Sequence, residues 1–305
     1  MKRFLLHVIL ILAPIALVLI GWEFLMRSSP HDLRFKRFGV MEECRKSGEM
    51  LVLGSSHAFY GVKTDSIPAA YNLAFVSQPL AYDRFIFETF LKKPNQLKFV
   101  VIPVSAFSLF GERGETETWK EEAYVRYWGY PAKNFTDKFF IFGNLPQQLK
   151  QYKKTQKRVK RRGIPEAFRM SKTGWGTHQA TFAQDEAFRK AAADAAARHC
   201  CVDLENIAAF EELEKLVSLA RENKIKVILF TPPAHKFYYE KLEPRQMKKM
   251  YELLSRFEGM PDVFYLDLLK SPLFVDADFG DADHLNPAGA EKLAKHLHQF
   301  ARSRK

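Results

Sequence analysis

The fold is decided by the stretch Leu51-Val52-Leu53-Gly54-Ser55-Ser56-His57, in which an apolar run meets a glycine and two serines. The apolar residues predict a short buried strand at 50–53, and the glycine predicts the turn that ends it. A serine at a helix start after such a turn lies at an exposed sheet edge, where backbone N–H groups point toward an anion. The stretch therefore makes Ser56 a candidate nucleophile, although an ordinary serine-capped turn would have the same sequence.

Further apolar runs alternate with amphipathic segments along the chain. Strands are predicted at 97–103, 225–230 and 263–266, and helices at 81–92, 205–223, 244–257 and 287–301. This alternation predicts an α/β fold, a flavodoxin-like three-layer arrangement with a parallel sheet covered by helices on both faces. Ligands of such sheets bind beyond the carboxyl ends of the strands, so residues 54–57 and 231–235 are expected to share one edge.

A second informative stretch, Asp281-Ala282-Asp283-His284, lies in the long loop after the last predicted strand. A histidine base needs an acceptor on its second nitrogen, and an aspartate three residues earlier in a turn can supply it. We therefore interpret Ser56, His284 and Asp281 as nucleophile, base and orienting acid. Two alternatives are a surface histidine beside a helix cap, and a calcium site without the EF-hand order, formed by Asp276, Asp278, Asp281 and Asp283.

The N-terminal segment is strongly apolar, and residues 4–20 contain no charged side chain. Residues 4–26 reach the ~20 residues that a membrane helix needs. Lys2 and Arg3 precede the segment, so the positive-inside rule places the N-terminus in the cytoplasm and the rest outside. No small-x-small cleavage site follows the run, which favours an uncleaved signal-anchor over a signal peptide.

These observations give an expected domain organisation for the 305 residues. Residues 1–27 form the membrane anchor, residues 28–48 a polar linker, and residues 49–305 one α/β domain. Residues 110–203 break the strand–helix alternation and are rich in aromatic and basic side chains. We interpret them as a partly helical insertion that caps or flanks the site.

Charge and cysteine content limit the possible partners. The net charge is +12, and much of it lies in the run at 150–162, which predicts either a solvated helix or a contact with an anionic surface. Nucleic acid is not an expected partner, because the chain has no recognised nucleic-acid module. Cys44 can form a disulfide with Cys200 or with Cys201, and the sequence leaves this pairing open. The cysteine spacing is not a zinc pattern, and we expect no metal or organic cofactor.

Together the two blocks resemble the SGNH (GDSL-like) hydrolase superfamily. Ser56 aligns with the family nucleophile, and Asp281 and His284 supply the family acid and base. The run His284-Leu285-Asn286-Pro287-Ala288-Gly289 is typical of the last family block. A membrane-anchored branch of bacterial envelope and polysaccharide proteins is similar at three further runs: Tyr71-Asn72-Leu73-Ala74 with Ser77-Gln78, Val101-Ile102-Pro103-Val104-Ser105, and Thr231-Pro232-Pro233.

The resemblance implies a serine esterase or O-acyltransferase that acts on acylated cell-envelope glycans. It places the chain in a bacterial cytoplasmic membrane, as a single-pass protein with its main domain outside, beside a membrane-bound O-acyltransferase. The chain lacks the family's Gly-x-Asn-Asp block, so Asn72, Gln78 and Ser105 are the candidates for the missing oxyanion donor. His57 and His235 are candidates to line the pocket or to be buried structural histidines. If no residue takes the place of the missing donor, we expect a catalytically degenerate accessory protein that binds polysaccharide or the acyltransferase.

Overall fold

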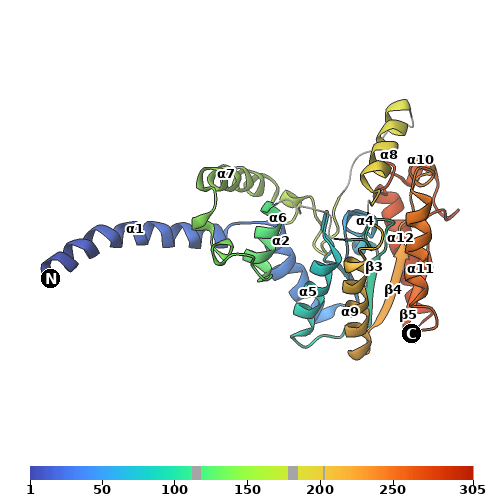
Figure 1. Cartoon of the computed structure of the whole chain (residues 1–305), viewed down its shortest axis with the longest axis horizontal. Helices are drawn as coiled ribbons and strands as arrows, with labels where there is room; N and C mark the ends of the chain where they lie inside the picture. The colour runs from blue at the N-terminus through green and yellow to red at the C-terminus, as the bar shows by residue number, and fades with distance from the viewer. Residues whose placement is uncertain (112–117, 178–184, 202, 305) are drawn as a thin grey trace. The chain divides into compact units, whose positions relative to one another are not determined.

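The computed structural model (Figure 1) describes residues 1–111, 118–177, 185–201 and 203–304. Two compact units divide the chain: one contains residues 38–115 and 169–305, and the other contains residues 1–37 and 116–168. The predicted insertion at 110–203 is therefore divided between the two units. Its first part belongs with the N-terminal helix, and its last part belongs with the sheet.

The larger unit is built on one five-stranded sheet. Its strands are β1 (Met50–Val52), β2 (Ala70–Asn72), β3 (Phe99–Pro103), β4 (Lys226–Thr231) and β5 (Val263–Asp267). All are parallel, in the order β2-β1-β3-β4-β5, and Leu51 of β1 is in register with Tyr71 of β2 and Val100 of β3. The four strands predicted from apolar runs are confirmed, whereas the short strand β2 was not predicted.

Helices cover both faces of this sheet, as the alternating pattern predicts. On one side α5 packs against α9, and α4 packs against α12 on the other (Figure 1). The flavodoxin-like three-layer fold is therefore confirmed. The helices of this unit are α3 (Met41–Ser47), α4 (Ser56–Gly61), α5 (Leu80–Leu91), α8 (Glu186–Arg198), α9 (Ala208–Glu222), α10 (Lys236–Tyr239), α11 (Pro244–Ser255) and α12 (Pro287–Arg302).

The predicted linker at 28–48 is wrong, because most of it is helical and part of it is buried. It contains α2 (Asp32–Phe35), a π-helical turn (Lys36–Val40) and α3. Val40, Met41 and Cys44 are fully buried, with α3 packed beside β2. Basic side chains between these apolar positions obscured the pattern. All three cysteines are free thiols in the structure.

The smaller unit contains α1 (Lys2–Ser28), α6 (Thr118–Ala123) and α7 (Leu145–Arg162). Of the described helices, α1 is long and apolar enough to cross a membrane, and none of its most apolar window is buried in the protein. Helix α7 carries the basic run and has no buried residue, which agrees with the interpretation of this run as a solvated helix. Short 3₁₀ turns at Phe135–Lys138 and Phe140–Phe142 connect the helices around the end of α1.

Candidate active site

Ser56 is the first residue of α4 and follows β1 through a tight glycine turn. Gly54 has a φ of +113°, a conformation that residues with a Cβ rarely adopt. A Cβ at this position would lie 2.3 Å from Cγ of Pro103, which ends the neighbouring strand β3. The N–H of Gly54 donates to Oδ1 of Asp83 at 2.8 Å and so fixes the turn to α5. Glycine therefore lets β1 end close to β3 and present Ser56 at their shared edge.

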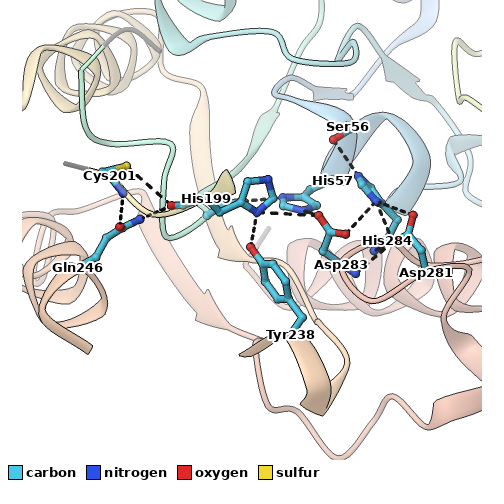
Figure 2. Close-up of polar contacts among 10 residues, drawn as sticks. Ser56, His57, His199, Cys201, Tyr238, Gln246, Asp281, Asp283 and His284 are labelled. Carbon is cyan, nitrogen blue, oxygen red and sulfur yellow. Dashed lines mark hydrogen bonds and ion pairs between the residues drawn. The ribbon is translucent and has the colours of Figure 1, made fainter. Parts of the chain in front are cut away.

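The structure brings Ser56, His284 and Asp281 together, although more than two hundred residues separate the first from the others (Figure 2). Nε2 of His284 lies 2.9 Å from Oγ of Ser56. Nδ1 of the same ring lies 3.0 Å and 3.1 Å from the two carboxylate oxygens of Asp281. This is the arrangement of a nucleophile, a base and an orienting acid.

Asp281 is held in place by its own turn. Oδ1 of Asp281 accepts hydrogen bonds from the backbone N–H of Asp283 at 3.1 Å and of His284 at 2.7 Å. Helix α12 begins directly afterwards, where Asn286 caps it by accepting from the N–H of Ala288 and Gly289. The three-residue spacing from acid to base is therefore set locally, as the sequence predicted.

A second carboxylate, Asp283, lies between two histidine rings (Figure 2). Its Oδ1 is 3.5 Å from Nδ1 of His284, and its Oδ2 is 3.5 Å from Nε2 of His57. His57 in turn places Nδ1 2.7 Å from Oγ of Ser105, the residue that follows β3 by two positions. Ser105, an oxyanion candidate, and His57, a pocket candidate, are thus connected to His284 through Asp283, and among the described residues neither has a hydrogen bond to Ser56.

The charges around His284 favour its protonated form. Burial by itself lowers the pKa of His284, but the carboxylates of Asp283 and Asp281 outweigh this effect and raise the pKa. Burial would raise the pKa of Asp283, but the rings of His284, His57 and His199 hold it well below its usual range. For His57, burial lowers the pKa and Asp283 opposes only part of the shift. We therefore assign the neutral ring to His57 and the stronger base to His284.

His199 was not predicted as a site residue, because it lies in the segment interpreted as an insertion. Its Nδ1 is 2.5 Å from the Tyr238 hydroxyl and 4.0 Å from Oδ2 of Asp283 (Figure 2). The backbone around it is fixed by Gln246, which donates to the His199 carbonyl at 2.8 Å and accepts from the Cys201 N–H at 2.7 Å.

Asn72 and Gln78 do not fit the predicted oxyanion role, because their amides are committed elsewhere. Nδ2 of Asn72 donates to the carbonyls of Ala58 and Val62, which ties α4 to the end of β2. Nε2 of Gln78 donates to the Leu73 carbonyl at 3.4 Å and to Oδ1 of Asp83. Each amide nitrogen has two hydrogens, so both donors are fully used.

The candidate oxyanion donor that remains is the backbone N–H of Ser56. Ser56 occupies the first turn of α4, where helix N–H groups have no partner within the helix. In the described part of the chain, no hydrogen-bond acceptor is paired with the Ser56 N–H. This donor is therefore available to an oxyanion that forms on Ser56.

His235, the second pocket candidate, has a structural role. Its Nδ1 accepts from the N–H of Phe237 and so caps α10. Its Nε2 lies 3.3 Å from Oδ1 of Asp276, and the side chain is 1% exposed.

The four acidic residues of the alternative calcium site pair with different basic side chains: Asp276 with His235, Asp278 with Lys292, Asp281 with His284, and Asp283 with His57. One ligand atom each from His57, Asp283 and His284 lies within 4.8 Å of the other two, close enough for a shared cation.

A small cavity lies behind the site, lined by His57, Ser105, Tyr238 and Asp283 among others. Its volume of about 20 Å³ is enough for one water molecule and too small for an acyl chain. Ser56, by contrast, is partly exposed at the sheet edge. Ser56 is thus accessible from the solvent side, and the cavity lies among the residues behind it.

No family model matches the chain, and no curated protein matches it by sequence. Among solved structures, a candidate acylhydrolase from Bacteroides fragilis is similar at 12% identity and a TM-score of 0.42, over 87% of this chain and 94% of that chain. A GDSL-like lipase from Bacteroides thetaiotaomicron is similar at 11% identity and a TM-score of 0.43, over 90% and 100%. A candidate platelet activating factor protein from Streptococcus pneumonia is similar at 11% identity and a TM-score of 0.38, over 94% and 98%.

Proposed function

We propose that the chain is a membrane-anchored serine esterase or O-acyltransferase of the SGNH type, with Ser56 as its nucleophile. The observation that supports this most directly is the chain of contacts from Ser56 through His284 to Asp281, at 2.9 Å and 3.0 Å. A hydroxyl is a weak nucleophile until a base takes its proton, and this geometry supplies the base.

In the first step the Ser56 oxygen attacks an ester carbonyl while its proton moves to Nε2 of His284. Asp281 keeps the proton on Nδ1 and stabilises the imidazolium that forms. The Ser56 N–H donates to the oxyanion, and the leaving alcohol takes the proton from His284 as the carbon–oxygen bond breaks. An acyl group is then bound to Ser56. Water completes a hydrolysis and a sugar hydroxyl completes a transfer. Each attacks the acyl carbon while giving its proton to His284, which returns that proton to the Ser56 oxygen as the bond between Ser56 and the acyl group breaks.

The acylated substrate is proposed to be an envelope glycan. Helix α1 is long and apolar enough to be the anchor, and Lys2 and Arg3 favour an extracytoplasmic main unit. The choice of a glycan rests on the resemblance of the runs at 71–78, 101–105 and 231–233 to a membrane-anchored branch of bacterial envelope and polysaccharide proteins. The proposed partner is a membrane-bound O-acyltransferase, which would supply or receive the acyl group.

Covalent labelling with a fluorophosphonate probe tests the proposal. Purified full-length protein in detergent should incorporate one probe molecule on Ser56, and Ser56→Ala and His284→Ala should abolish labelling. Ser303→Ala is the matched control, because this exposed serine caps the end of α12 and bonds to the Phe300 carbonyl, and it should label like wild type. Labelling of another residue, or labelling that persists in Ser56→Ala, would contradict the assignment.

A second candidate is a catalytically degenerate accessory protein. The observation that favours it is the commitment of both Asn72 and Gln78 to structural hydrogen bonds, which leaves a backbone donor for the oxyanion. Loss of one oxyanion donor typically costs about 10²–10³ in rate. Complementation of a deletion strain separates the two functions: Ser56→Ala restores the phenotype if the protein is an accessory, and fails to restore it if the protein is an enzyme.

A further inference from the structure

The end of α1 is tied to the 3₁₀ segment at 135–142 within the smaller unit. Oε2 of Glu23 accepts hydrogen bonds from the backbone N–H of Phe140 at 2.7 Å and of Ile141 at 3.2 Å. Arg27 donates to the carbonyl of Lys138 at 2.6 Å. These bonds hold the 3₁₀ segment beside residues 23–27 of α1, at the turn where the apolar stretch of the helix ends.

The same end of α1 also contacts the first turns of α7. Nε1 of Trp22 donates to Oε1 of Gln148 at 3.0 Å, and Gln148 donates to the Phe140 carbonyl at 2.9 Å. The indole, the amide and the 3₁₀ segment therefore form one hydrogen-bonded group around residues 22–27 of the helix.

Three phenylalanines of the segment form an aromatic group next to Arg27 at this end of α1. Phe135 and Phe142 are 70% and 60% exposed, which is unusual for side chains of this size. Phe139 lies between them, with ring centroids 5.2 Å from Phe135 and 6.1 Å from Phe142. Two cations flank the group: Lys138 lies over the ring of Phe135 at 5.6 Å, and Arg27 lies over that of Phe139 at 6.0 Å.

This aromatic group continues the exposed apolar surface of α1. Ile20 and Phe24, on the last turns of the helix, are 64% and 74% exposed. As a helix, the stretch from Phe4 to Phe24 is about 30 Å long, the thickness of the hydrocarbon core of a bilayer. The polar residues Glu23 and Arg27 then lie at the outer boundary of that core, and the aromatic group lies at the same level.

We propose that Phe135, Phe139 and Phe142, with Arg27 and Lys138, form an interfacial collar that inserts into the outer leaflet around α1. Aromatic rings concentrate at the boundary between headgroups and acyl chains, and basic side chains reach from there to lipid phosphates. The occupant of this surface is a bilayer that contains anionic phospholipid, because the surface is apolar at its centre and has basic side chains at its rim. Lys138 is exposed there, and Arg27 also pairs with Glu23 at 2.7 Å. The proposal rests on the proposed anchoring by α1.

The collar gives the smaller unit a second attachment to the membrane. A single apolar helix can shift in depth and tilt, and interfacial aromatic and basic anchors limit both. With the collar inserted, the end of α1 is fixed at one level relative to the headgroups. The collar is thus a positioning device for the segment that follows the anchor.

Spin labels on the full-length protein test the proposal, with the protein in nanodiscs of phosphatidylcholine and phosphatidylglycerol that hold no partner protein. The background carries Cys200→Ala and Cys201→Ala, and its circular dichroism and melting temperature, compared with wild type, check folding; Cys44 is buried and does not react. Single variants Phe135→Cys and Phe142→Cys report on the collar. Collision rates with oxygen and with a water-soluble nickel chelate then give the depth of each label.

Two control labels make the outcome decisive. Ile11→Cys, at the middle of α1, reports whether the helix crosses the bilayer, and Ile164→Cys, a 45% exposed residue beyond α7, reports an aqueous site. We expect collisions with oxygen to dominate at Ile11 and collisions with the nickel chelate to dominate at Ile164. At both collar positions, the collision rates with oxygen and with the nickel chelate should be comparable.

Either of two results overturns the collar. If Ile11 is in lipid but both collar labels resemble Ile164, the collar is wrong, the anchoring stands, and a protein partner becomes the occupant to test. If Ile11 itself is in water, the anchoring and the collar are both wrong.

Discussion

Oδ1 of Asp283 lies 3.5 Å from Nδ1 of His284, the nitrogen that also faces Asp281 at 3.0 Å. The Asp283 side chain is 10% exposed and that of Asp281 is 28% exposed. Charges interact more strongly where water is excluded, so the more buried carboxylate acts on the ring from a longer distance with comparable effect. Asp281 has the geometry to fix the tautomer, and Asp283 adds negative charge that raises the basicity of His284.

The first prediction concerns the pH dependence of the Asp283→Asn variant. His284 acts as a base only when it is neutral, and Asp283 raises its pKa. Removal of this charge lowers the pKa of His284, so the acidic limb of kcat/KM should move to lower pH. The measurement is a pH profile of p-nitrophenyl ester hydrolysis, with the plateau rate expected within about tenfold of wild type.

Asp281→Asn is the matched comparison, because both variants replace a carboxylate by an amide of nearly the same volume. Loss of the residue that fixes the tautomer should lower kcat by about 10²–10⁴ across the whole profile. An acidic limb that stays in place in Asp283→Asn shows that Asp283 does not tune His284. A loss in Asp283→Asn as large as that in Asp281→Asn would instead assign the orienting role to Asp283.

The second prediction is that Gly54→Ala destabilises the sheet edge. Gly54 has a φ of +113°, and a new Cβ would lie 2.3 Å from Cγ of Pro103. Backbone strain and overpacking together should cost about 2–4 kcal/mol of unfolding free energy, measured by urea denaturation. Gly61→Ala, where a Cβ makes only ordinary contacts at 3.8 Å and 3.9 Å, is the control and should change stability by less than about 1 kcal/mol.

Much of the fold could be predicted because the main strands are local apolar runs. Phe99–Pro103 and Lys226–Thr231 carry enough consecutive β-branched and aromatic residues to indicate buried strands by themselves. Strand β2 is different: Ala70–Asn72 has no such pattern, and its pairing with β1 decides its conformation. The helices at 28–48 were not predicted for a related reason. The few apolar residues of this segment are recognisable as core only once β2 lies beside them.

The candidate site divides in the same way. The spacing of Asp281 and His284 is a property of one turn, and Gly54 with Ser56 is a property of one strand end, so both could be predicted. The contact between Asp283 and His57 depends on which loops meet at the sheet edge, and no local pattern indicates it. The role of an amide such as Asn72 likewise depends on which carbonyls lie opposite, which only the folded chain determines.

The third prediction separates structure from catalysis at Asn72. The side chain is fully buried, donates to the carbonyls of Ala58 and Val62, and accepts from the Ala74 N–H. Asn72→Ala leaves these backbone groups without partners and should cost about 2–4 kcal/mol of stability. Well below its lowered melting temperature, the variant should retain kcat within about threefold. A stable variant with a large loss of kcat would restore Asn72 as an oxyanion donor.

The fourth prediction uses the titration of Asp83, which fixes the Gly54 turn from α5. Burial raises the pKa of Asp83 from 3.8 to about 7, against the hydrogen bonds that it accepts from Gln78 and the Gly54 N–H. The folded state therefore holds a proton that the unfolded state releases between pH 4 and 7. Stability should fall as the pH rises through this window and stay level above it.

Asp83→Asn removes the titration and retains an oxygen that accepts from Gly54 and Gln78. The stability of the variant relative to wild type should thus increase from pH 4 to pH 7, by at most about 4 kcal/mol. Urea unfolding of both proteins at each pH measures the difference, and Asp267→Asn, at the exposed end of β5, is the control for general charge effects. A difference that does not change with pH would show that Asp83 is ionised in the folded protein at pH 4. The Gly54 turn would then be held by a carboxylate over the whole of this pH window.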